Sequence, residues 1–227
     1  MFSTILLDHV VRTFGAVRAT RVLDVGCGRG PYRDLMEPEL YVGIDRTPAA
    51  EGDGLLVEAD ATALPLSSAT FDGLVCTEVI EHVPDEKAFA EELARVATPG
   101  ATLVLSAPFV HGLHELPYDF RRLTSIGLVR VLSDAGWEVC SVAAIGGPLV
   151  VSVDSAVRWG TSRLQGVARR VSSAPARRAI EALPARLQVV LAAVALRGSA
   201  GRGQPIDPEV PVPPITLGYV VVARRRS

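Results

Sequence analysis

The segment from residue 21 to residue 31, RVLDVGCGRGP, constrains the fold of this chain more than any other stretch. Its apolar residues form the short run that is typical of a buried parallel strand, and an acid, Asp24, lies near the end of that run. Gly26, Gly28 and Gly30 follow at every second position. Glycine permits a sharp turn with positive φ and the close approach of a ligand. A strand, this turn and a short helix over residues 32–37 together predict a nucleotide-type pocket at the carboxyl end of a sheet.

The spacing of the glycines distinguishes two kinds of cofactor site. Dinucleotide-binding domains carry G-x-G-x-x-G, whereas this segment reads D-x-G-x-G-x-G. The pattern resembles motif I of the class I S-adenosylmethionine-dependent methyltransferases. The resemblance implies that Asp24 supports the turn and that Gly26, Cys27, Gly28 and Gly30 surround the methionine part of S-adenosylmethionine. An ordinary turn that binds nothing is the structural alternative, and the missing fingerprint argues against a dinucleotide-dependent oxidoreductase.

Composition excludes several other classes of protein. An apolar content of 48% over 227 residues is sufficient for one large domain, or for one domain with an appendage. The net charge of −2 gives no indication of nucleic-acid binding. Cys27, Cys76 and Cys140 are widely spaced, which indicates reduced thiols rather than a disulfide framework or a zinc site, so no metal is predicted. The first residues lack the pattern of a signal peptide, and a cytoplasmic location is therefore expected.

Acidic residues follow two further predicted strands. Residues 41–44 form the first, and Asp45 stands at its tip, about twenty residues after the glycine turn. A carboxylate there can accept hydrogen bonds from two vicinal ribose hydroxyls; a solvated turn acid is the alternative. The strand over 55–58 is followed by Asp60 and Ala61, which the resemblance places at the adenine amino group and at a ring nitrogen.

Two later runs extend the resemblance. The run LPLSSATFDGLVC, residues 64–76, is similar to the family pattern D-x-x-x-L-P-F-x-x-x-x-F-D, with Leu66 in place of the usual aromatic residue. The run TEVIEHVPD, residues 77–85, is similar to the signature that follows the fourth strand in this family. It implies that Thr77 and Glu78 line the cofactor pocket near the sulfonium.

The stretch from residue 108 to residue 124, PFVHGLHELPYDFRRLT, is rich in histidine, acids, arginine and aromatic residues. It follows the predicted strand over 102–106, and the loop after such a strand lies over the ligand crevice of an open sheet. Similar runs occur at the acceptor side in a subgroup of the family. His111 and His114, and after them His82, are therefore candidate general bases. The structural alternative is that residues such as Asp119 and Arg121 only hold the loop in place.

The resemblance, which covers residues 21–139 well, implies an α/β fold with a Rossmann-like, mostly parallel seven-stranded sheet. The strand order it implies is 3-2-1-4-5-7-6, with helices on both faces. The strand over 217–223 completes the sheet after a helical insertion. The predicted methyltransferase domain is therefore 1–147 with 215–227, and residues 148–214 form a basic helical insertion and a linker. A further helix is predicted over residues 2–14.

The insertion is basic and carries apolar runs. Residues 148–204 contain nine arginines against one aspartate and one glutamate, a net charge of +7. Neither of its main apolar runs, 149–153 and 187–196, reaches the length of a membrane-spanning helix. Contact with an anionic membrane, a homodimer interface and a lid over the acceptor all fit such a segment, with the lid or the interface slightly favoured.

The resemblance to methyltransferases of the ubiquinone- and menaquinone-biosynthesis type implies methyl transfer from S-adenosylmethionine to a small-molecule or lipid-linked acceptor, at oxygen. Transfer by proximity alone, without a base, stays open. The alternative is a non-catalytic S-adenosylmethionine-binding protein that acts through its helical insertion, because the cofactor motifs would be intact in that case too.

Overall fold

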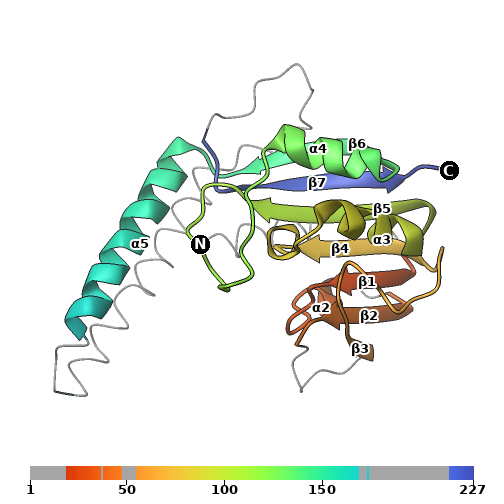
Figure 1. Ribbon diagram of the computed structural model, residues 1–227, viewed down its shortest axis with the longest axis horizontal. Helices are drawn as coiled ribbons and strands as arrows, with labels where there is room; N and C mark the ends of the chain where they lie inside the picture. The colour runs from red at the N-terminus through yellow and green to blue at the C-terminus, as the bar shows by residue number, and fades with distance from the viewer. Residues whose placement is uncertain (1–18, 37, 48–54, 169–172, 174–214) are drawn as a thin grey trace.

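The computed structural model of this protein describes residues 19–36, 38–47, 55–168, 173 and 215–227 (Figure 1). The predicted helix over residues 2–14 and most of the predicted insertion after residue 168 lie outside the described residues.

Seven strands form one sheet in the order β3-β2-β1-β4-β5-β7-β6, which confirms the predicted order. The strands are β1 (Arg21–Val25), β2 (Leu40–Asp45), β3 (Leu55–Glu58), β4 (Phe71–Thr77), β5 (Ala97–Pro108), β6 (Trp137–Ile145) and β7 (Gly218–Arg225). The helices are α2 (Arg33–Met36), the 3-10 turn η1 (Ile80–His82), α3 (Glu86–Val96), α4 (Ser125–Asp134) and α5 (Pro148–Ala168). Strands β1 to β5 pair in parallel, whereas β7 pairs antiparallel with both β5 and β6. The parallel strands therefore end at one edge of the sheet.

Apolar side chains cover both faces of the sheet, as expected for buried parallel strands. On one face, Leu23 and Val25 of β1 pack in the core that includes Phe89 of α3 and Leu128 of α4. On the other face, Val22 of β1 packs in a second cluster that contains residues of α2 and α5. Figure 1 shows α3 and α4 lying across the sheet, with α5 at the edge where the parallel strands end.

Strand β5 begins earlier than the sequence predicts. The sequence indicates that Pro99-Gly100 stops the preceding helix and that the strand begins at residue 102, but Ala97 already pairs with Phe71 of β4. The register shifts before Thr102 pairs with Gly73, and Gly100 has a φ of 80° within this irregular stretch. Helix α3 therefore ends at Val96, before the Pro-Gly pair, and the pair itself lies inside the strand.

Helix α5 forms the first part of the predicted insertion. Val151 and Val157 on α5 are buried, whereas Leu149 and Trp159 are exposed. Arg158 donates to the buried carboxylate of Asp154 over 2.6 Å. None of the helices in the described ranges is long and apolar enough to cross a membrane.

The glycine turn after β1 is held by the end of β2. The backbone N–H groups of Gly26 and Cys27 both donate to the carbonyl of Ile44, over 2.7 and 3.0 Å. Gly26 has a φ of 74°, and a Cβ built on it would lie 2.1 Å from Cγ2 of Val79, in the segment after β4. Glycine at position 26 is thus required both by backbone conformation and by packing.

This packing predicts unequal effects of two alanine substitutions in the turn. Gly26→Ala should lower the free energy of unfolding by about 2–5 kcal/mol, because it combines a left-handed backbone with overpacking against Val79. Gly28→Ala should lower it by about 1–2 kcal/mol, because Gly28 has a φ of 51° but no atom within 4 Å of a built Cβ. Urea unfolding of both variants measures the difference, and equal losses would contradict the proposed packing.

Candidate functional site

A cavity of about 440 Å³ opens where β1, β2, β3 and β4 end. Its lining includes most of the residues that the sequence assigns to the cofactor: Gly26, Gly28, Asp45, Asp60, Ala61, Thr77 and Glu78. The other three, Asp24, Cys27 and Gly30, do not contribute to the lining. The structure therefore gathers the predicted cofactor residues around one space.

Asp45, at the end of β2, connects the second strand to the glycine turn. Its Oδ2 accepts a hydrogen bond from the Gly28 N–H over 3.0 Å, and its Oδ1 accepts one from the Thr47 N–H over 3.1 Å. Each carboxylate oxygen has a further lone pair, so two vicinal hydroxyls can still donate to it. The space beside Gly28 is open. These features fit a nucleoside with its ribose at Asp45.

Asp60 shapes the turn after β3. Its Oδ1 accepts from both the N–H and the hydroxyl of Thr62, over 2.8 and 2.7 Å. These two bonds lower the pKa of Asp60, so its carboxylate stays charged. Its second oxygen can accept a hydrogen bond from an amino group in the cavity, as the sequence predicts for adenine.

Asp24 lies behind the cavity and is fully buried. It accepts a 2.5 Å hydrogen bond from the hydroxyl of Tyr41 rather than from the N–H groups of the turn. Burial raises the pKa of Asp24 to about 7. The Cys27 thiol is also buried, and burial together with the charges of Asp24 and Asp45 raises its pKa to about 12, so it is an inert thiol.

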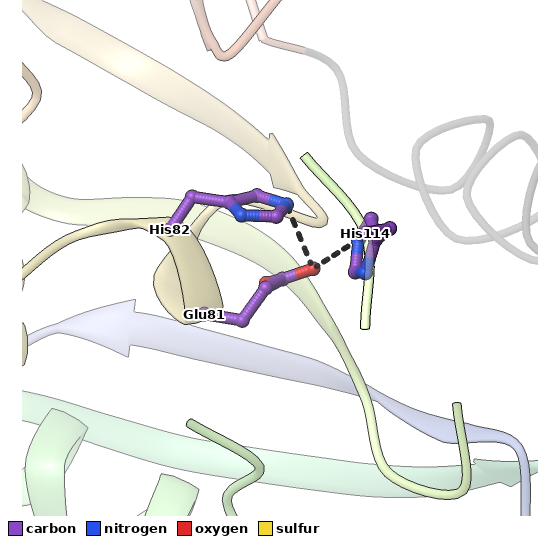
Figure 2. A group of neighbouring side chains, drawn as sticks. All are labelled: Glu81, His82 and His114. Carbon is purple, nitrogen blue, oxygen red and sulfur yellow. Dashed lines mark ion pairs between the residues drawn. The ribbon is translucent and has the colours of Figure 1, made fainter. Parts of the chain in front are cut away.

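The segment after β4 places polar side chains at the cavity wall. The hydroxyl of Tyr32 donates to Oγ1 of Thr77 over 3.2 Å. Glu78 has a φ of 57°, and its Oε1 accepts a 2.9 Å hydrogen bond from the hydroxyl of Ser106 on β5. Burial raises the pKa of Glu78 to about 7. The turn η1 then brings Glu81 and His82 to the same region (Figure 2).

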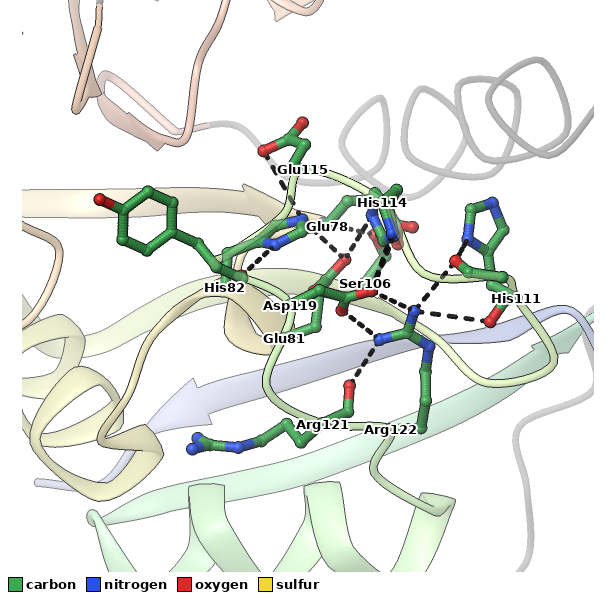
Figure 3. A network of polar contacts seen from close by, with 12 residues as sticks. Glu78, Glu81, His82, Ser106, His111, His114, Glu115, Asp119, Arg121 and Arg122 are labelled. Carbon is green, nitrogen blue, oxygen red and sulfur yellow. Dashed lines mark hydrogen bonds and ion pairs between the residues drawn. The ribbon is translucent and has the colours of Figure 1, made fainter.

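The three histidines named by the sequence form a row that leads away from the cavity. The rings of His82 and His114 have centroids 4.7 Å apart, and so do those of His114 and His111 (Figure 3). His82 lines the cavity, whereas His114 and His111 do not. Nε2 of His111 lies 2.8 Å from Arg158 of α5, and burial and this cation lower the pKa of His111. Of the three candidate bases, His82 is thus the one that faces the cavity.

The loop over residues 109–124, here called the acceptor loop, is held by a partly buried ion pair. Both terminal nitrogens of Arg122 donate to the carboxylate of Asp119, over 2.5 and 2.8 Å, and this pairing lowers the pKa of Asp119. Asp119 also accepts a 2.9 Å hydrogen bond from the His114 N–H. Arg121 donates to the Pro84 carbonyl. Asp119, Arg121 and Arg122 therefore fix the loop beside η1.

Several residues of this region have no role that the sequence predicts. Glu115, Tyr118 and Phe120 of the acceptor loop line the cavity. The guanidinium of Arg46 lies 4.4 Å over the ring of Tyr118, and this cation–π contact joins the segment after β2 to the acceptor loop. Glu81 is buried beside His82, and burial together with the charge of Glu78 raises its pKa to about 8. Glu81 belongs to the run EVIEH, residues 78–82. The resemblance of this run to the family signature is the sequence signal that could have indicated a role for Glu81.

The buried carboxyl of Asp24 predicts a pH dependence of stability. Its pKa is raised from 3.8 in an unfolded chain to about 7, so between these values the folded protein retains a proton that the unfolded chain releases. Stability from this group is full below about pH 4 and is lost as the pH rises to 7, by at most about 4 kcal/mol. Asp24→Asn removes this titration. The gap in unfolding free energy between the variant and the wild type should therefore change across this window and stay level above it. A gap that urea unfolding finds constant from pH 4 to pH 8 would contradict the assignment.

Comparison with known proteins gives related sequences along the same segment. A family model described as "Methyltransferase domain" matches residues 23–105. A Mycobacterium tuberculosis protein named "Probable S-adenosylmethionine-dependent methyltransferase" is 31% identical over 174 residues, which are 69% of this chain and 63% of the relative. A ubiquinone biosynthesis O-methyltransferase of Alkalilimnicola ehrlichii is 31% identical over 114 residues, 44% of this chain and 46% of the relative. The chain thus spans less than two thirds of the length of these relatives.

Solved structures share the fold at lower sequence identity. An S-adenosylmethionine-dependent methyltransferase from Archaeoglobus fulgidus superposes with a TM-score of 0.58 at 16% identity, over 98% of this chain and 94% of the other. The [4+2]-cyclase SpnF gives a TM-score of 0.59 at 19% identity, over 97% and 80%. The matched segment 23–105 contains the glycine turn, Asp45, Asp60 and the TEVIEHV run. With its strand order and these sequence relatives, the chain belongs to the class I S-adenosylmethionine-dependent methyltransferases.

Proposed function

We propose that this protein transfers the methyl group of S-adenosylmethionine to an oxygen atom of a small-molecule or lipid-linked acceptor. One observation carries the proposal: a single cavity is lined on one side by Gly28 and Asp45, and on the other by His82 and the acceptor-loop residues Glu115 and Tyr118. A nucleoside cofactor and an acceptor can therefore meet in one space.

The chemistry requires little of the protein beyond alignment and removal of a proton. The sulfonium already activates the methyl group, so an acceptor oxygen displaces it in line. Nδ1 of His82 lies 2.7 Å from the Tyr118 carbonyl, which can only accept, so Nδ1 carries the ring proton. The lone pair of His82 is then on Nε2. A neutral imidazole suits proton uptake near neutral pH.

Exposed apolar side chains near the site support a lipid-linked acceptor. Leu113 and Leu116 of the acceptor loop are 75% and 68% exposed, on either side of the cavity-lining Glu115. On α5, Leu149 and Trp159 are also exposed. Such side chains can contact a hydrocarbon chain whose reactive head enters the cavity. Contact of residues 148–204 with a membrane or with a second copy stays a prediction, because only 148–168 and 173 of that segment are described.

A non-catalytic cofactor-binding role is the competing function. One protein with a similar fold is named a [4+2]-cyclase, a name that does not mention methyl transfer. The fold alone therefore does not determine the reaction. An assay distinguishes methyl transfer from cofactor binding alone. Purified protein is incubated with methyl-labelled S-adenosylmethionine and an extract of the source organism. Label in an O-methyl product that forms only when the protein is added to the extract supports methyl transfer. Cofactor binding without any labelled product other than the cofactor supports the competing role.

Removal of the Asp45 carboxylate should weaken cofactor binding. Asp45→Ala should raise the Kd for S-adenosylhomocysteine about tenfold to a hundredfold, because charged hydrogen bonds contribute about 1.5–3 kcal/mol. Isothermal titration calorimetry measures the change, and NAD should not bind. An unchanged Kd would exclude Asp45 from the ribose site.

Asp85 offers a matched control for this substitution. Asp85 caps α3 by accepting from two backbone N–H groups, those of Lys87 and Ala88, outside the cavity. Asp85→Ala should lower the free energy of unfolding by about 1 kcal/mol and leave the Kd unchanged. Equal weakening in both variants would mean that lost stability, rather than lost contact, explains the result.

The position of His82 predicts which histidine matters for turnover. His82→Asn keeps a donor near the Tyr118 carbonyl but removes Nε2, and it should lower the rate of label transfer about a hundredfold with the Kd for S-adenosylhomocysteine nearly intact. His111→Asn should change the rate only a few fold, because His111 lies outside the cavity lining. The reverse order of effects would assign the base to His111.

A further inference from the structure

Three side chains, Glu81 and His82 of η1 and His114 of the acceptor loop, converge on one point (Figure 2). Oε1 of Glu81 lies 3.6 Å from Nε2 of His82 and 3.8 Å from Nε2 of His114. One ligand atom from each of these residues lies within 4.8 Å of the others. Glu81 and His82 are buried, and His114 is 26% exposed, so a group at this point would be largely shielded from water.

The Glu81 carboxylate is buried without a hydrogen-bond partner in the described part of the chain. Its side chain is 1% exposed, and neither Oε1 nor Oε2 accepts a hydrogen bond from the described residues. Buried polar groups are nearly always paired, and an unpaired buried carboxylate is strongly unfavourable. A carboxyl group at this position is stable either in its protonated form or as a carboxylate with a positive charge beside it.

His82 directs a lone pair at this carboxylate, and His114 brings a second ring nitrogen to it. Nδ1 of His82 donates to the Tyr118 carbonyl over 2.7 Å, which leaves Nε2 without a proton in the neutral ring. Nδ1 of His114 lies 3.4 Å from Oδ2 of Asp119, and Arg122 holds that carboxylate (Figure 3). Metal-binding histidines typically have such a carbonyl or carboxylate at the second ring nitrogen. The three residues thus place two imidazole nitrogens and one carboxylate oxygen close enough to bind one cation.

We propose that Glu81, His82 and His114 bind a divalent transition-metal cation of the Zn²⁺, Mn²⁺ or Co²⁺ type. Two imidazoles and one carboxylate are a common ligand set for such ions and leave a further position open. Ligands about 2.1 Å from a tetrahedral ion lie roughly 3.4 Å apart. The distances of 3.6 and 3.8 Å from Oε1 of Glu81 to the two histidine nitrogens therefore need to contract by only a few tenths of an ångström. Oε2 of Glu115, 3.8 Å from Nε2 of His82, is close enough to act as a fourth ligand.

The cation would serve the reaction at the acceptor oxygen, an inference that rests on the proposed function. His82 and Glu115 line the cavity, so the open position faces the space for the acceptor. A bound cation lowers the pKa of a hydroxyl that coordinates it. The hydroxyl proton passes to water, and an oxygen lone pair forms the O–CH₃ bond. The S–CH₃ bond breaks with its electrons going to sulfur, which leaves S-adenosylhomocysteine. In this state His82 binds the cation instead of the proton.

Direct titration of the full chain tests the site without any acceptor. Protein treated with a chelator and dialysed is titrated with ZnSO₄, MnCl₂ or CoCl₂ by calorimetry. Cobalt binding is also followed by visible absorption, which is strong for tetrahedral coordination. One equivalent should bind, and Glu81→Gln should weaken the binding at least thirtyfold, because it keeps the shape of the side chain but removes its charge. Glu91→Gln, at an exposed acid on α3, should leave binding unchanged.

His114→Asn provides a second variant, should Glu81→Gln fail to fold, and the thermal unfolding of each metal-free variant checks its fold. Equal binding by the wild type and a folded variant, or no binding by the wild type, would overturn the proposal and assign the site to a proton. Label transfer measured in parallel separates the two claims. Transfer by a protein that binds no metal overturns the cation site alone, whereas metal binding without transfer overturns the proposed function alone.

Discussion

The rest of the site depends on the hydrogen bonds between the end of β2 and the glycine turn. The Ile44 carbonyl accepts from Gly26 and Cys27, and the Asp45 carboxylate accepts from Gly28. These bonds fix the turn between two strands that already pair in register, residues 21–25 with residues 40–44. They also orient the Asp45 carboxylate into the cavity. Because Gly26 packs against Val79, the same turn sets the position of the segment after β4, which carries Glu78 and η1.

The acceptor side is built on a different principle, the burial of charge. The Asp119–Arg122 pair fixes a loop that has no regular secondary structure, and the Phe120 N–H donates to the Glu81 carbonyl over 2.8 Å. These contacts bring His114 to within ion-pair distance of Glu81. A buried pair of this kind adds little stability by itself, but breaking one partner is costly, so it holds a loop in one arrangement. The cofactor side is fixed by backbone geometry and the acceptor side by side-chain charge.

The two sides differ in how far the sequence predicts them. The spacing of the glycines and Asp45 is local, and the order of the strands follows from the family resemblance, so both were predicted and the strand order is confirmed. The ranking of the histidines depends on how the acceptor loop folds back onto η1, which no local pattern specifies. His82 was placed last among the candidate bases, yet it lines the cavity. No metal was predicted, because Glu81 and His82 meet His114 only through the tertiary fold.

The central claim is that cofactor and acceptor share one cavity, with the reactive sulfur directed at the histidine side. A crystal structure of the protein with S-adenosylhomocysteine tests it most directly. We expect the ribose hydroxyls on the Asp45 carboxylate, the adenine beside Asp60 and Ala61, and the sulfur facing His82 and Glu115. A ligand bound outside this cavity, or bound within it with its sulfur turned away from His82, would contradict the account.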